Sequence, residues 1–252
     1  MIIKSRTIIG VCVFASVTAL STLASGAPSN ADPRAIMRRA EEIRAPESSE
    51  MKVKLDTTSA ARSSSYTMKI LASTGHRSYS EFIAPAEERG RRMLALGRNY
   101  FSTLPDSKRV VPISRRELIG NSAFAVADLF QIDTEKEYEP KVTGTETVDN
   151  AAATRLELTA ISDDAPYAKI HYFVRPADSF PVMARFFGVS GKLLKTLTVI
   201  SRKELAGEIR PDQLRMDDNV TKGKFSIWTT ESMVKKKVAD RVFTREYLQS
   251  QQ

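Results

Sequence analysis

Residues 90–118 read GRRMLALGRNYFSTLPDSKRVVPISRREL, in which apolar and aromatic side chains alternate with many arginines and lysines. Successive side chains of a strand point to opposite faces, so this pattern predicts strands over residues 91–96, 99–104 and 109–113. Each strand would have one apolar face and one solvent-exposed face. Taken alone, this mixture of charge and apolar residues is compatible with a nucleic-acid surface, an enzyme's strand or part of a lipid-handling sheet.

The same period of two extends to both sides of this stretch. Met51, Val53 and Leu55 alternate with charged neighbours, and residues 66–72 repeat the pattern. Such half-buried strands are typical of antiparallel sheets. Further strands are predicted over residues 77–84, 138–148, 154–161, 169–175, 182–188, 192–201, 214–219 and 224–230, separated by turn signals such as Asp149-Asn150 and Ser190-Gly191. About a dozen strands with few helices favour a mainly β fold, a single strongly curved antiparallel sheet or barrel in one domain.

Two segments depart from this pattern. Asp32 and Pro33 are an N-cap and a first-turn residue for a helix over residues 34–44, whose apolar positions recur at helical spacing. Residues 122–130, SAFAVADLF, break the alternation between two groups of strands. This second segment is predicted to be a short helix or a structured loop that makes apolar contacts.

The N-terminus has the pattern of a secretory signal peptide. Lys4 and Arg6 precede an apolar run over residues 8–23, and small residues follow it. The alternative, a transmembrane anchor, is disfavoured because the run is shorter than the roughly 20 apolar residues that span a bilayer. We expect residues 1–26 to be the signal peptide, with cleavage between Ala24 and Ala31, and residues 27–252 to form the domain.

The single cysteine, Cys12, lies inside this apolar run and has no small-residue lipobox before it. It would be removed with the signal peptide, so the exported chain would contain no disulfide and no thiolate metal site. Export without disulfides suits a bacterial periplasm.

The charge of the chain is moderately basic. Loss of Lys4 and Arg6 with the signal peptide would lower the formal net charge from +8 to +6. Export argues against nucleic acid, so an anionic membrane face, lipid head groups or an acidic partner are the expected counterparts. Four arginines would form an anionic docking patch, unless they only line a solvated face or protect a sheet edge: Arg91, Arg92, Arg115 and Arg116.

The sequence offers little for catalysis. The chain has only two histidines, and His171 lies within a strand, where a packed or solvated side chain is the simpler interpretation. Adjacent acids such as Asp163 and Asp164 belong to a turn, because neighbours on a strand would point to opposite faces. No nucleophile elbow, phosphate-binding loop or zinc motif is present. We therefore predict no enzyme, no catalytic residue, no cofactor and no metal.

The apolar strand faces are the more informative feature. A sheet of this size must cover its apolar face, and few helices are available, so part of that face would line a cavity for an apolar ligand. The alternative is a filled core. The residues predicted to line the cavity are Tyr66, Met68, Ile70, Leu94, Leu96, Phe101, Leu104, Phe124, Leu156, Leu158, Tyr172, Phe225 and Ile227.

Four segments carry a family resemblance in their order along the chain: DPRAIMRRAEEIR (32–44), SYSEFIAPAEERGRRMLALG (78–97), NYFSTLPDSKRVVPIS (99–114) and GNSAFAVADL (120–129). Together they resemble the periplasmic outer-membrane lipoprotein-sorting proteins, in the superfamily of the lipoprotein carrier LolA and its receptor LolB. Looser matches follow in RPADSFPVMARFF (175–187) and RVFTREYL (241–248).

The resemblance implies an incomplete antiparallel β-barrel of about eleven strands, curled around helices that cover an apolar hollow. It also implies a non-enzymatic, monomeric carrier that binds acyl chains of lipoproteins or lipids for transit between the inner and outer membranes. An inner-membrane transporter or an outer-membrane acceptor would be its partner. The alternative is a sensing or scaffold module of the same fold, with a filled core and a protein partner.

Overall fold

The computed structural model describes residues 32–103, 109–130 and 133–250. The predicted signal peptide, Cys12 and the candidate lining residue Leu104 lie outside these residues.

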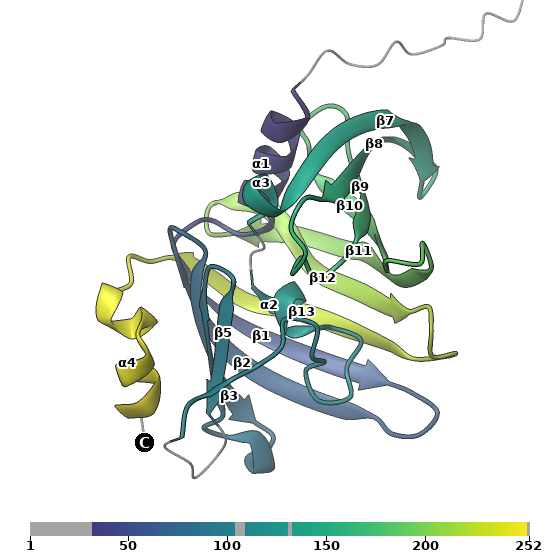
Figure 1. Cartoon of the computed structure of the whole chain (residues 1–252). Coiled ribbons are helices and arrows are strands. Elements are labelled where there is room, and N and C mark those ends of the chain that lie inside the picture. Colours follow the sequence, from purple (N-terminus) through teal and green to yellow (C-terminus); the bar gives the residue numbers. More distant parts are fainter. Residues whose placement is uncertain (1–31, 104–108, 131–132, 251–252) are drawn as a thin grey trace, which may run out of the picture.

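The described strands form one antiparallel sheet of thirteen strands in the order β6-β5-β4-β3-β2-β1-β13-β12-β11-β10-β9-β8-β7 (Figure 1). The first group of strands is β1 (Ser49–Thr58), β2 (Ser64–Ser73), β3 (Arg77–Ala84), β4 (Arg92–Leu96), β5 (Asn99–Thr103) and β6 (Val111–Pro112). The second group is β7 (Tyr138–Val148), β8 (Ala151–Ala160), β9 (Lys169–Val174), β10 (Pro181–Phe187), β11 (Leu193–Leu205), β12 (Glu208–Asp218) and β13 (Phe225–Lys235).

Within each group every strand pairs with the next one along the chain, and the pairing of β1 with β13 joins the groups. The turn between β7 and β8 has the backbone conformation that a two-residue hairpin requires. Asp149 and Asn150, between β7 and β8, both have positive φ, as the two central residues of a type I′ turn do. The edge strands β6 and β7 are not neighbours in the sheet, so it is curved but not closed.

Residues 113–137 connect the two edge strands, and we call this segment the strap. It contains α2 (Val126–Leu129) and ends in α3 (Thr134–Glu137). An isolated bridge between Leu118 and Ala125 folds its first part back on itself. Figure 1 shows the strap crossing in front of the sheet, with α2 over β13. The segment predicted as a short helix or a structured loop is therefore both.

Of the remaining helices, α1 (Pro33–Arg44) precedes the first strand, and the 3₁₀ turn η2 (Asp240–Phe243) and α4 (Arg245–Ser250) follow the last one. A second 3₁₀ turn, η1 (Ala86–Glu88), lies between β3 and β4. The Asp32 side chain accepts a hydrogen bond from the Arg34 backbone N–H at 3.0 Å, as an N-cap does. At the other end of α1, the buried guanidinium of Arg210 on β12 donates to the Ile43 carbonyl at 2.9 Å. No helix in the described part of the chain is long and apolar enough to cross a membrane.

The main hydrophobic core lies between the concave face of the sheet, α1 and the strap. Val53, Leu55 and Met68 contribute from the sheet, Met37 from α1 and Phe124 from the strap. Each of these side chains is almost fully buried. The predicted half-open antiparallel fold with few helices is confirmed. The described sheet has thirteen strands where about eleven were expected from the resemblance, and one of them, β6, has only two residues.

A second hydrophobic cluster lies on the outer face of β3, β4 and β5. Leu94 is fully buried there, with Leu96 and Phe101 packed around it, and they contact Phe243 of η2 and Leu248 of α4. Figure 1 shows α4 beside these strands, away from α2. The prediction that Leu94, Leu96 and Phe101 face the hollow is therefore wrong. They are apolar because the C-terminal segment covers the outer face at this point.

Candidate functional site

Two apolar cavities remain between the concave face, α1 and the strap. The first lies over β1, β2 and β13, and its walls include Met51, Ile70 and Trp228. The second lies over β8 to β12, and its walls include Leu158 and Tyr172. Both cavities are also lined by Arg44 of α1, Phe124 and Asp128 of the strap, and Leu214 of β12. They are two halves of one hollow, separated by strap residues.

The hollow is narrow in this conformation. The first cavity has a volume of about 50 Å³ and the second of about 70 Å³. A water molecule needs roughly 10–15 Å³ on this measure, and a methylene group is about as large as a water molecule. Each cavity therefore holds a few methylene groups, and a complete acyl chain requires the hollow to widen.

The structure places seven of the predicted lining residues in the concave core. Ile70, Phe124, Leu158 and Tyr172 line a cavity. The other three, Tyr66, Met68 and Leu156, belong to the same core but line neither cavity.

Phe225 and Ile227 were also predicted to face the hollow, and this is wrong. Trp228 pairs with Leu55 of β1, and both side chains belong to the concave core. The period of two then turns Phe225 and Ile227 to the outer face. There the Phe225 ring lies 3.9 Å below the guanidinium carbon of Arg215.

The predicted basic docking patch does not form. Arg92 is buried and lies 3.5 Å from Glu81, and the half-buried Arg91 lies 3.3 Å from Glu88. Arg115 is buried in the strap. Only Arg116 is exposed, and its guanidinium donates hydrogen bonds to the carbonyls of Ala165 and Pro166. Arg91 and Arg92 thus pair with carboxylates close by in sequence, whereas Arg115 and Arg116 join segments that are distant in sequence.

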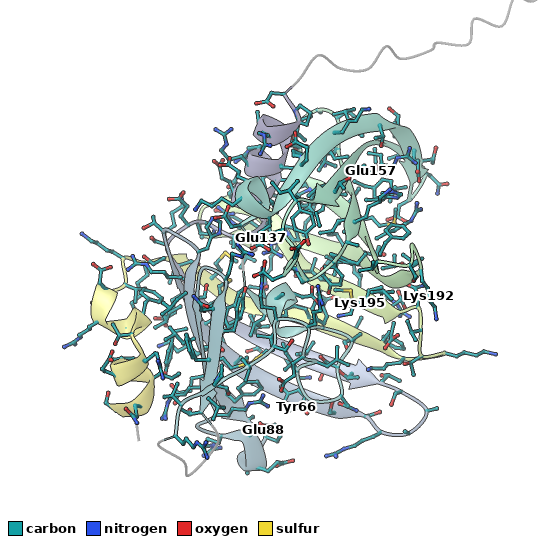
Figure 2. All side chains as sticks on the ribbon, viewed as in Figure 1. Tyr66, Glu88, Glu137, Glu157, Lys192 and Lys195 are labelled. Atoms are coloured by element: carbon teal, nitrogen blue, oxygen red, sulfur yellow. The ribbon has the colours of Figure 1, made fainter. Side chains whose placement is uncertain are left out.

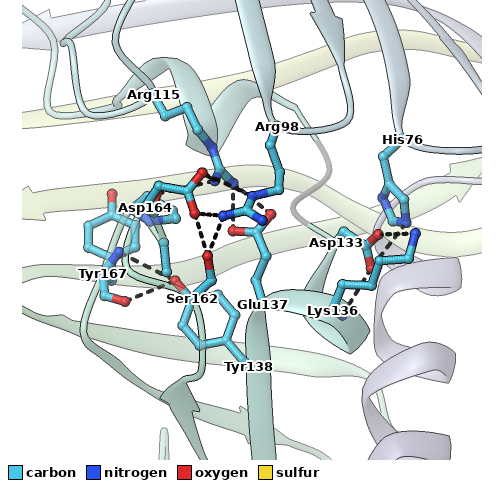
Figure 3. Close-up of polar contacts among 12 residues, drawn as sticks. His76, Arg98, Arg115, Asp133, Lys136, Glu137, Tyr138, Ser162, Asp164 and Tyr167 are labelled. Carbon is cyan, nitrogen blue, oxygen red and sulfur yellow. Dashed lines mark hydrogen bonds and ion pairs between the residues drawn. The ribbon is translucent and has the colours of Figure 1, made fainter.

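The two ends of the strap are joined by a buried ion pair. Arg115 Nη2 lies 2.8 Å from both carboxylate oxygens of Glu137, and the two side chains are 8% and 1% exposed. Arg98, from the turn between β4 and β5, donates through Nε to Asp164 Oδ2 at 2.9 Å. Figure 3 shows these four side chains converging between the two halves of the sheet. The cluster holds the strap in place between the two edges of the unclosed sheet.

A second polar anchor holds α2 against the sheet. Asp128 accepts hydrogen bonds from Lys195 Nζ at 3.2 Å and from the Tyr167 hydroxyl at 2.7 Å. Figure 2 labels Lys195, which β11 supplies. Burial and the negative charge of Asp128 hold the pKa of Tyr167 well above its usual value. The carboxylate of Asp128 lies in the wall of the hollow, and Lys195 and Tyr167 already bind it.

The contact between α1 and the strap contains a titratable group. Glu41 accepts a hydrogen bond from the Thr134 hydroxyl at 2.9 Å and lines the second cavity. Burial raises the pKa of Glu41 to about 7, although the nearby Arg44 guanidinium acts in the opposite direction. Near neutral pH a substantial fraction of this carboxyl group is uncharged.

The described residues contain no cluster of three or more His, Cys, Asp or Glu side chains that could hold a metal ion. His171 lies 3.1 Å from Glu157 and packs against the Phe187 ring, with centroids 4.7 Å apart. Its neighbours Ile170 and Tyr172 line the second cavity, so His171 points to the outer face. It occupies the packed strand position that the sequence indicated.

Comparison with known proteins places the chain in a family. A family model described as an uncharacterized protein matches residues 74–250, most of the chain. The chain belongs to this family. A solved LolA superfamily protein from Nitrosomonas europaea is 27% identical to it, with a TM-score of 0.78 over 85% of this chain and 98% of that protein. The resemblance to the LolA superfamily seen in the sequence is thus confirmed.

Two further solved structures share the fold. A DUF1329 family protein from Desulfovibrio piger is 19% identical, with a TM-score of 0.76 over 86% of this chain and 100% of that one. A domain ascribed to outer membrane lipoprotein sorting, from Vibrio parahaemolyticus, is 22% identical, with a TM-score of 0.74 over 86% of this chain and 96% of that one. No curated protein matches the chain in sequence.

Proposed function

We propose that this chain is a periplasmic, non-enzymatic carrier or accessory protein. It binds the acyl chains of lipoproteins or lipids in the hollow for transit between the inner and outer membranes. The observation that carries this proposal is the pair of apolar cavities on either side of Phe124, under the strap and at the centre of an unclosed sheet. The similarity to a LolA superfamily protein supports it.

Burial of the acyl chain would supply the affinity, at roughly 0.8 kcal/mol for each methylene group removed from water. Because the cavities are narrow, loading requires the strap or α1 to move away from the concave face. The pair Arg115–Glu137 and the contacts of Asp128 with Lys195 and Tyr167 resist this movement. The cycle we propose therefore alternates between the closed form seen here and an open, loaded form.

The small volume of the cavities favours a second candidate, a sensing or scaffold module with a filled core and a protein partner. The two functions differ in what remains bound during mild purification. A carrier retains lipid, whereas a scaffold is free of lipid and retains a specific protein.

The proposed function is tested by uptake of a fluorescent fatty acid into delipidated protein. Leu214 lines both cavities, so Leu214→Trp fills the hollow, and the expected result is loss of uptake. Ile227→Trp is the matched control, because Ile227 is a half-buried residue on the adjacent strand that faces outward. Uptake that is unchanged in Leu214→Trp, or equally reduced in both variants, would contradict binding in the hollow.

A further inference from the structure

Arg44 is a half-buried cation in the wall shared by the two apolar cavities. It belongs to the last turn of α1 and lines both cavities, next to Phe124, Asp128 and Leu214. No hydrogen bond or ion pair joins its guanidinium group to another residue in the described part of the chain. A partly buried charge without a counter-ion is unfavourable. The C-terminal end of the helix dipole offsets part of this cost.

The groups around Arg44 balance its charge only in part. Asp128 already binds Lys195 and Tyr167. Glu41, one helical turn before Arg44, is partly protonated near neutral pH because burial raises its pKa to about 7. On the sheet side lies Tyr172, whose pKa burial raises to about 12, so its hydroxyl remains a hydrogen-bond donor. The hollow thus presents a positive charge to both cavities and a hydrogen-bond donor in the second.

We propose that the ligand is an anionic lipid, an acyl chain whose polar end is a carboxylate or a phosphate, and that this acidic group binds Arg44 while the chain enters the cavities. This inference rests on the proposed function and names its ligand class. A guanidinium group fits a carboxylate or phosphate with two parallel hydrogen bonds, and such charge-assisted bonds are stronger than neutral ones. A purely neutral acyl ligand would leave Arg44 unpaired.

The position of Arg44 along the hollow also fits an anionic lipid. Arg44 touches both halves, so a head group bound there can direct its chain toward the Trp228 side or toward the Tyr172 side. Trp228 is the only tryptophan in the sequence, and it lines the first cavity. Its fluorescence therefore reports a chain that enters that half without any added label.

The test compares matched lipids of equal chain length on the full exported chain, followed by Trp228 fluorescence and calorimetry. Palmitate is compared with hexadecanol, and lysophosphatidic acid with monoacylglycerol. We expect each acid to bind at least about tenfold more tightly than its neutral counterpart, as charged hydrogen bonds imply. Comparing the two acids distinguishes a carboxylate ligand from a phosphate ligand.

The variant Arg44→Met should remove this preference and keep the weaker binding of the neutral lipids. Arg38→Met is the matched control, since Arg38 lies on the same helix and lines neither apolar cavity. If wild-type protein binds acids and neutral lipids equally, or Arg44→Met keeps the preference, the inference is overturned and the proposed function stands. If neither class of lipid binds wild-type protein, the proposed function fails as well.

Discussion

Removing one partner of the ion pair that closes the strap should strongly destabilise the fold. In the variant Glu137→Gln the side chain keeps its size but loses its charge, and Arg115 stays buried without a carboxylate partner. Both partners are nearly inaccessible, with side chains 8% and 1% exposed, so water does not replace the lost interaction. Removing one member of a buried pair costs about 3–5 kcal/mol. Since the amide still accepts a hydrogen bond from Arg115, we expect a loss of about 3 kcal/mol.

The measurement is the free energy of unfolding from urea titrations at pH 7. An unchanged slope of this free energy against urea concentration shows that the fold is retained. The control is Glu139→Gln, which breaks the pair with Arg34, whose side chains are 37% and 60% exposed. Exposed pairs contribute less than about 1 kcal/mol. Equal, small effects of the two substitutions would refute the conclusion that the Arg115–Glu137 pair fastens the strap.

Three further substitutions test other parts of the fold. Burial raises the pKa of Glu41 from its ordinary 4.5 to about 7, so the folded chain holds this proton more tightly and loses stability as the pH rises from 4.5 through 7. Glu41→Gln should reduce that loss, by about 1–3 kcal/mol at pH 8 in urea titrations. Gly120 has a φ of +56° and packs against the Tyr66 hydroxyl, so Gly120→Ala should lower the melting temperature and cost at least about 1–2 kcal/mol. Leu248→Ala should weaken the docking of α4 by about 2–5 kcal/mol and speed proteolysis of the C-terminal segment.

Each of these has a distinct contradicting result. A pH profile of stability that is identical in wild-type protein and Glu41→Gln would show that Glu41 does not titrate as described. A Gly120→Ala protein as stable as wild type would mean that Tyr66 and the backbone adjust without cost. Unchanged proteolysis of Leu248→Ala would show that α4 is held by other contacts.

The elements of this fold could be predicted from the sequence because their signals are local. Asp32 and Pro33 mark the start of α1, and the period of two marks the long strands. The interruption at residues 122–130 identifies the strap, and Phe124 emerges as a residue of the hollow. Each of these signals depends on neighbours within a few positions.

The face toward which a strand turns its apolar residues could not be predicted at two places. In β4, Met93 faces the concave core and Leu94 the outer cluster, so both faces are apolar. In β13, Trp228 faces inward while Phe225 and Ile227 face outward. Alternation alone cannot choose between two apolar faces. At β4 the choice depends on the C-terminal segment, more than a hundred residues further along the chain.

The role of the arginines was equally hidden. Arg115 reads as a surface residue until Glu137 is seen to pair with it across the strap. Arg44 reads as one more basic residue of an amphipathic helix, since only the fold places it between two apolar cavities. Long-range pairing, or its absence, distinguishes a structural arginine from one available to a ligand.

The central claim is that the hollow holds an acyl chain. Native mass spectrometry of the protein exported to a bacterial periplasm and purified without detergent tests this most directly. The account predicts a bound species with the mass of a lipid, which is absent from Leu214→Trp and present in Ile227→Trp. Protein that is free of lipid after this purification, and that also takes up no lipid when palmitate or hexadecanol is added, would contradict it.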